Sequence, residues 1–175
     1  MRLLPVPILA LGLVACGRQA AGPGAGELLV SWQGVERGSD RMPAAATLCA
    51  RDSTVELLAS RDDRGVGLAL HLTAAAPAPG RIPVLNPNLD VLPRPAATGA
   101  YRYLSPESLR GFVSRDGEVE LAEAGPAGLT GRFTLRLVAL AGPDTLVLTG
   151  SFRAVPLAEA ALPCGQASPT PVEIP

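Results

Sequence analysis

Apolar and polar residues alternate along most of the chain, in short segments that turn-forming residues separate. In the first segment, Leu28, Val30 and Trp32 share one parity. Residues 55–72 contain two such segments around the polar cluster 61–65. This pattern predicts a β-hairpin, because successive side chains of a strand point to opposite faces and polar clusters favour turns.

Two further hairpins are predicted downstream. The Asp-Gly pair at 116–117 lies between the apolar segments of residues 112–121, and Asp-Gly is a common two-residue hairpin turn. The clearest hairpin covers residues 129–154, where Gly142, Pro143 and Asp144 separate two long alternating segments.

About eight or nine alternating segments and the lack of a long helical period predict an all-β fold, either an antiparallel β-sandwich or a small barrel. The one helical candidate is a single turn over residues 105–110, where Ser105 suits a cap and Pro106 the first turn. Six prolines lie between residues 74 and 95. They confine this stretch to a loop or a sheet edge, because proline has no N–H to donate to a ladder.

The form Thr-Gly-x-aromatic occurs at residues 98–101, 130–133 and 149–152. Glycine and ring are two residues apart, so they share one face of a strand. We expect a ring from an adjacent strand to cover each glycine. The alternative is a pocket with a glycine floor and aromatic walls.

The chain begins with Arg2 and an apolar stretch from Leu3 to Ala15, followed by Cys16 and a Gly/Pro/Ala-rich run. The stretch is shorter than the about 20 residues of a membrane span and ends in a small residue, as a secretory signal peptide does. The sequence therefore predicts a signal peptide over residues 1–15.

Leu13-Val14-Ala15-Cys16 resembles the lipobox of bacterial lipoproteins. The resemblance implies that the signal peptide is cut before Cys16, that the Cys16 thiol is diacylated with chains such as palmitate, and that the new amino terminus is often acylated. Two or more acyl chains give a stable membrane anchor. Gly17 rather than aspartate follows, which in this family implies the outer membrane where the organism has two. An ordinary signal peptide with an incidental cysteine is the alternative.

Further divisions follow from this anchor. Residues 16–26 form a lipidated cysteine with a flexible tether, residues 27–166 a single β domain, and residues 167–175 a disordered tail. With Cys16 assigned to lipid, Cys49 and Cys164 remain in a compartment that permits disulfides, and a bridge between them is expected. Two buried thiols or a redox pair are the alternatives, although no Cys-x-x-Cys spacing supports the latter.

Charge and composition exclude some partners. The formal net charge is −1, and all fifteen basic residues are scattered arginines. Nucleic-acid binding normally needs a basic patch with interleaved aromatic residues, so no nucleic-acid partner is expected.

Candidate chemistry is sparse. The single histidine, His71, faces away from Leu70 and Leu72 by alternation and is expected to be solvated rather than a ligand or base. One histidine cannot compose a zinc site, and no Gly-x-Ser-x-Gly motif indicates a hydrolase. We predict no catalytic residue, metal ligand or cofactor.

Two groups of acidic and amide side chains could serve either as functional groups or as ordinary parts of turns and sheets. Calcium ligands are available in two loops, but turn formation explains them equally well: Asp62, Asp63, Asn86, Asn88 and Asp90. Acidic residues over 118–123 face Arg132 and Arg136 if the strands pair, as cross-strand ion pairs rather than a glycosidase pair.

The whole pattern is similar to small β-domain lipoproteins of the bacterial envelope without assigned activity. This likeness rests on the lipobox, the glycine-aromatic strands and the near-terminal cysteine. The expected function is a membrane-anchored, non-catalytic domain that binds an envelope protein or has a structural role. A lipocalin-like carrier of a small apolar ligand is the alternative, and an enzyme the third.

Overall fold

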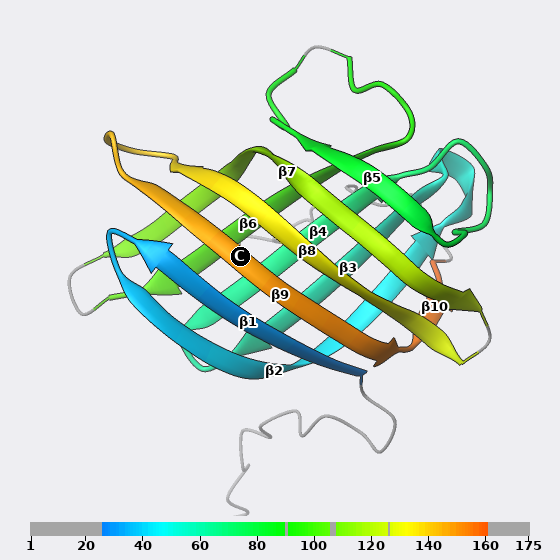
Figure 1. Ribbon diagram of the computed structural model, residues 1–175, viewed down its shortest axis with the longest axis horizontal. Coiled ribbons are helices and arrows are strands. Elements are labelled where there is room, and N and C mark those ends of the chain that lie inside the picture. The colour runs from blue at the N-terminus through cyan, green and yellow to red at the C-terminus, as the bar shows by residue number, and fades with distance from the viewer. Residues whose placement is uncertain (1–25, 90, 106–107, 126, 161–175) are drawn as a thin grey trace, which may run out of the picture.

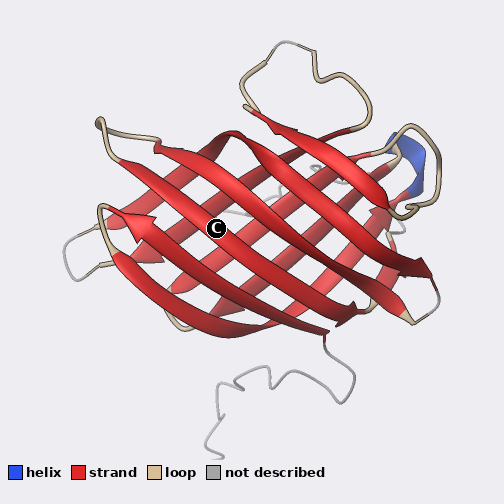
Figure 2. Cartoon of the chain, viewed as in Figure 1, coloured by secondary structure: helices blue, strands red, loops and turns tan. Residues whose placement is uncertain are grey.

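The computed structural model describes residues 26–89, 91–105, 108–125 and 127–160, and the all-β prediction is confirmed. These residues form ten strands and one 3₁₀ turn, η1 (Ala50–Asp52), as Figure 2 shows. The strands are β1 (Gly26–Gly34), β2 (Arg37–Cys49), β3 (Thr54–Arg61), β4 (Arg64–His71), β5 (Gly80–Leu85), β6 (Ala96–Leu104), β7 (Leu109–Gly125), β8 (Gly128–Ala139), β9 (Thr145–Val155) and β10 (Leu157–Glu159).

The strands form one sheet that closes on itself. Its order is β1-β9-β8-β7-β5-β6-β4-β3-β2-β10, and the additional antiparallel pairing of β1 with β2 makes a ring of the first nine. Figure 1 shows two layers whose strands cross, with β1, β9, β8 and β5 in one layer and β6, β4 and β3 in the other. Both a sandwich and a barrel are compatible with this arrangement.

Two of the three predicted hairpins are confirmed. Antiparallel β3 and β4 pair over residues 54–71, and Asp62 lies in their turn with a positive φ of 49°. β8 and β9 form the longer hairpin, with Gly142 in its connection at a φ of 89°.

The second predicted hairpin is wrong, because residues 112–121 belong to the single long strand β7. The Asp-Gly pair directly follows a bulge at Arg115, where the register of β7 against β8 shifts between Ser114 and Asp116. Before the bulge β7 pairs with β6, and after it with β5. A bulge bends the bulged strand, and Figure 1 shows β7 passing from one layer to the other.

Ser114 connects the three strands that meet at this bulge. Its side chain is fully buried, its hydroxyl donates to the Leu85 carbonyl at 2.6 Å, and its Oγ accepts from the Gly99 N–H at 3.0 Å. Gly117 has a φ of 147°, and a side chain there would meet the Thr134 carbonyl oxygen. The Asp-Gly pair therefore serves a change of strand partner instead of a chain reversal.

The predicted helical turn over residues 105–110 is corrected at its second half, and its residues 106 and 107 lie outside the described residues. Leu109 and Arg110 already belong to β7, and Ser105 closes the connection from β6 by hydrogen bonds with Ser108. The 3₁₀ turn among the described residues is η1, which lies at the opposite end of the ring. In the proline-rich stretch, β5 pairs along its length with β7 and touches β6 only at Val84, so the expected edge character is largely retained.

The inward side chains fill the space between the two layers. Alternate residues of the ring strands are buried, and the largest fully buried side chains include Tyr101, Phe112 and Phe152. Trp32 of β1 and Tyr101 of β6 meet with ring centroids 5.7 Å apart, although three strands separate them in the sheet. This contact therefore crosses the interior of the ring.

The expected cover of glycines by neighbouring rings is confirmed for two of the three Thr-Gly-x-aromatic segments. Gly131 of β8 is the register partner of Phe152, and Phe133 is the partner of Gly150 of β9. A Cβ at either glycine would lie 2.5 Å from the ring of the opposite phenylalanine. At the third, Gly99, the side chain of Leu135 takes the place of a ring.

We predict that Gly150→Ala lowers the free energy of unfolding by about 1–3 kcal/mol, because its methyl group would overpack the Phe133 ring and the Leu29 carbonyl. Urea denaturation measures this value. Gly125→Ala is the matched control, since no atom lies within 4 Å of its Cβ position, and its effect should stay within about 0.5 kcal/mol. Equal stability of both variants would contradict the reciprocal packing.

Candidate functional site

The ring has two dissimilar ends. At one end, here called the turn end, lie the connections β1–β2, β3–β4, β6–β7 and β8–β9, at the left of Figure 1. At the other, the terminal end, lie the start of β1, η1 and the strand β10. The candidate sites are these two ends and the outer face of the sheet between them.

An arginine closes the turn end. The Arg64 guanidinium donates to Glu36 Oε1 at 2.8 Å and to the Tyr101 hydroxyl at 2.5 Å, and Tyr101 donates to the same carboxylate at 3.0 Å. Its carbon Cζ lies 4.7 Å from the centroid of the Trp32 ring and 5.3 Å from that of Tyr103. The cation is thus held by a carboxylate, a phenol and two aromatic faces.

The charges of this cluster are already matched. Burial raises the pKa of Tyr101 above its ordinary value, so the phenol stays protonated. Burial opposes the charge of Arg64, but the hydrogen bonds to Glu36 and Tyr101 outweigh it and raise the pKa of the guanidinium. The arrangement joins β1, β4 and β6 and favours a structural role.

The terminal end contains Cys49, the last residue of β2. It is buried and disulfide-bonded. β10 runs parallel to β2, and the Ala160 N–H donates to the Leu48 carbonyl at 2.9 Å. The chain thus lies next to Cys49 four residues before Cys164, which is itself outside the described residues. The pairing of these two cysteines stays a prediction that this geometry favours.

His71 also lies at the terminal end, and it is half-buried rather than solvated. Its Nδ1 is 3.5 Å from Thr54 Oγ1. Burial and then the charge of Arg94 lower the pKa of His71. Arg94 itself donates to three backbone carbonyls at 2.7–3.2 Å, those of Asp52, Ser53 and Leu72. This network ties η1 to β4.

The calcium alternative is explained by turns. Asp62 takes a left-handed turn conformation, and Asn86 Oδ1 accepts the Asn88 N–H at 2.9 Å; Asp90 lies outside the described residues. In the part of the chain that the structure describes, no three His, Cys, Asp or Glu side chains lie close enough to hold a metal ion.

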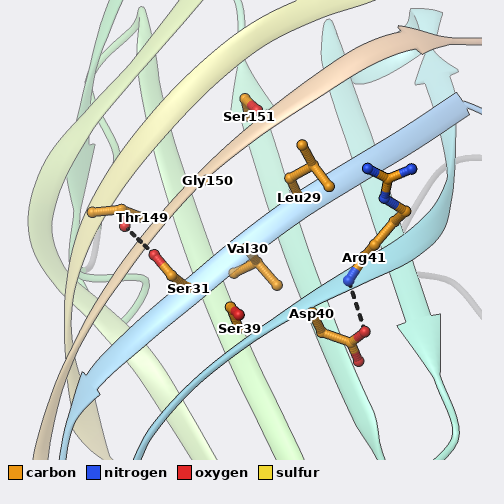
Figure 3. A pocket seen from close by; sticks show the side chains of 9 residues that line it. All are labelled: Leu29, Val30, Ser31, Ser39, Asp40, Arg41, Thr149, Gly150 and Ser151. Atoms are coloured by element: carbon orange, nitrogen blue, oxygen red, sulfur yellow. Dashed lines mark hydrogen bonds between the residues drawn. The ribbon is translucent and has the colours of Figure 1, made fainter.

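One half of the outer face is polar. Over β2, β1 and β9 there is a shallow open hollow of about 540 Å³, whose lining residues Figure 3 shows. Small hydroxyl side chains dominate it, and the hydroxyls of Ser31 and Thr149 are hydrogen-bonded at 2.7 Å. The Asp40 carboxylate accepts the Arg41 N–H and is 3.2 Å from Arg61. Its charged groups therefore have partners.

The predicted cross-strand ion pairs continue this polar half. Arg132 donates to Glu120 Oε2 through Nε at 3.1 Å and Nη2 at 2.7 Å, and Arg136 is bonded to Asp116. The hydrogen bond with Arg132 lowers the pKa of Glu120. Both pairs join register partners of β7 and β8. The pair of Glu120 with Arg132 confirms the expected cross-strand pairing, whereas Asp116 was expected in a turn and instead pairs with Arg136.

The other half of the outer face is apolar. Leu58, Gly67, Ala100, Val113 and Val138 are successive register partners across β3, β4, β6, β7 and β8. Toward the turn end follow Leu104, Leu109, Gly111 and Leu140. We call these nine residues the apolar patch.

The patch concentrates exposed leucines. Among the described residues, five large apolar side chains are more than half exposed, and four of them belong to the patch: Leu58 at 61%, Leu104 at 56%, Leu109 at 64% and Leu140 at 69%. This feature is not predictable from alternation alone, because the residues come from five strands and the connection after β8, and only the register brings them together.

Two apolar hollows lie in the patch. One, of about 400 Å³, is lined by residues of β3, β4 and β6, including Leu58, Gly65 and Gly67. The other, of about 350 Å³, is lined by residues from β6 to β8, including Leu109, Gly111 and Leu140. Both share residues 100–102, so Arg102 lies between them.

We predict that a reductant lowers the thermal stability of the chain, because the bridge from Cys49 to Cys164 would close a loop of about 115 residues worth roughly 4–5 kcal/mol in the chain-entropy model. Melting with and without reductant measures the effect. Cys49→Ala should melt at the lower temperature in both conditions. Identical melting of the wild-type chain in both conditions would contradict the bridge.

No protein-family model matches this chain, and no curated protein or solved structure is significantly similar to it. Within the described residues, no helix is long and apolar enough to cross a membrane. The geometry of the outer face is therefore the basis for a functional proposal.

Proposed function

We propose that this chain is a lipid-anchored envelope protein whose β domain binds a partner protein through the apolar patch and acts by binding rather than by catalysis. The observation that carries the proposal is the exposure of four leucines on one half of the outer face. Contiguous apolar surface on a folded domain is typical of an interaction site.

The energetic argument is the burial of these side chains. Transfer of an exposed leucine side chain out of water contributes about 1.5–3 kcal/mol. Gly67 and Gly111, which have no side chain, and the small Ala100 separate the leucines, so the surface has the hollows that shape complementarity needs. The polar half offers a partner less binding free energy, because its charged groups are already paired across the strands.

Packing inside the ring favours this proposal over a carrier of a small apolar ligand. A carrier needs an interior cavity of several hundred cubic ångströms. Instead, Phe133 and Phe152 lie directly on glycines, and Trp32 meets Tyr101 across the interior. An enzyme needs convergent polar groups, whereas Arg64 and its partners satisfy one another.

The proposed anchor fits the position of the patch. β1 begins at the terminal end, so the tether predicted over residues 16–26 would join the ring there, with an average reach of about 18 Å. Leu104, Leu109 and Leu140 lie at the opposite turn end, and a nine-residue strand such as β1 spans about 30 Å. The patch would then face away from the anchoring membrane.

We predict that Cys16→Ser releases the protein from the membrane fraction or stalls its processing, because the acyl chains would then have no thiol to bind. Fractionation and the intact mass measure this outcome. Ser31→Ala, a substitution on the polar outer face, is the control for expression and should leave membrane retention unchanged. Retention of the Cys16→Ser protein with a normal mature mass would refute the anchor.

We also predict that the full chain, cross-linked in detergent-solubilised envelope, enriches one partner that Leu109→Asp and Leu140→Asp deplete at least about tenfold, since charge in an apolar interface is costly. Leu29→Asp is the matched control, because Leu29 is an exposed leucine on the polar half. Enrichment that is equal for all four proteins, or no enrichment, would overturn partner binding by the patch.

A further inference from the structure

An unpaired arginine occupies the centre of the apolar patch. Arg102 points outward from β6, is exposed, and has Gly65 and Gly111 as its register partners. Its Nε lies 3.2 Å from the position of a Cβ on Gly65, so the side chain extends across β4 where no other side chain stands. Within the described residues, no carboxylate forms an ion pair with Arg102, whereas Arg110 nearby is bonded to Asp144.

The two apolar hollows flank this guanidinium. The hollow toward β3 has Leu58 on its rim, and the hollow toward β8 has Leu109 and Leu140. Each hollow, at about 350–400 Å³, can accept an aliphatic side chain. From β3 to β8, the surface is therefore first apolar, then cationic at Arg102, and then apolar again.

We propose that the occupant of the patch is a segment of a partner protein that presents one carboxylate between apolar side chains, with the carboxylate on Arg102 and an apolar side chain in each hollow. This inference rests on the proposed function, since it names the chemistry of the same binding face.

The need for a carboxylate follows from desolvation. A partner that covers the leucines also removes water from Arg102, and burial of an arginine without an anion is strongly unfavourable. A planar guanidinium pairs best with a carboxylate, which can accept two hydrogen bonds from it. A partner that makes the apolar contacts must therefore also supply a carboxylate for Arg102.

A second copy of this chain fits the patch less well. In a two-fold dimer centred on the patch, the two Arg102 side chains would approach one another. The patch itself contains no carboxylate. At its border, Asp144 is bonded to Arg110, and Asp63, which lies beside Leu104, is 3.9 Å from Arg64. A partner of complementary charge satisfies both the leucines and the arginine.

The test uses the full chain in detergent and a dye-labelled synthetic peptide with one glutamate between leucines. Its counterpart carries glutamine in place of the glutamate. By fluorescence anisotropy, the wild-type chain should bind the glutamate peptide about tenfold more tightly than the glutamine peptide. Arg102→Glu should abolish this difference, and Arg102→Lys should retain part of it. Arg153→Glu is the matched control, as an exposed arginine on the other half of the face, and should leave it unchanged.

Several results would overturn the inference. These are equal binding of both peptides, no binding of either, and no effect of Arg102→Glu. Sedimentation of the full chain as a dimer that Leu140→Asp dissociates would assign the patch to a second copy. Binding of the Cys16→Ser protein to anionic phospholipid vesicles that Arg102→Glu abolishes, without peptide binding, would assign it to a membrane.

Failure of this inference can be separated from failure of the proposed function. If Leu109→Asp depletes the cross-linked envelope partner and Arg102→Glu does not, partner binding through the patch is supported and recognition of a carboxylate by Arg102 is refuted. If no variant changes the enrichment of the cross-linked partner, partner binding through the patch is refuted as well.

Discussion

Pairing of β1 with β2 is the constraint on which the rest of the structure depends. Once the sheet closes, the inward side chains share one interior of fixed size, and each must fit those that face it. The reciprocal contacts of Phe133 with Gly150 and of Phe152 with Gly131 are one solution. The chain has only six aromatic residues. Each phenylalanine ring that lies over a glycine fills space in which two large side chains would clash.

Alternation in the sequence was sufficient to predict the fold class and the hairpins of β3 with β4 and β8 with β9. It was insufficient at residues 116–117, because Asp-Gly suits both a two-residue turn and a bulge. The choice between them depends on which strands lie alongside. β7 changes its partner from β6 to β5 at that place, and this is a tertiary property that no local window contains.

The candidate site was less predictable than the fold. Alternation identifies Leu58, Ala100 and Val113 as outward residues, but adjacency comes only from the register of β3, β4, β6 and β7. The same limit applies to Arg102, which forms no ion pair within the described residues, because its neighbours come from β4 and β7. By contrast, the ion pair of Glu120 with Arg132 was predictable, because a hairpin-like neighbour and opposite charges suffice.

Ring closure also determines how this domain can meet a partner. The strands of the ring pair with one another over most of their length, so few edges are open to the addition of a partner strand. The exceptions are β5, which pairs with β6 only at Val84, and β10 at the end of the sheet. Recognition then falls to outward side chains, and the two halves of the face differ in what they retain. Arg132 and Arg136 use their charge in ion pairs on the sheet itself, whereas the proposed binding face keeps an exposed Arg102 with exposed leucines beside it.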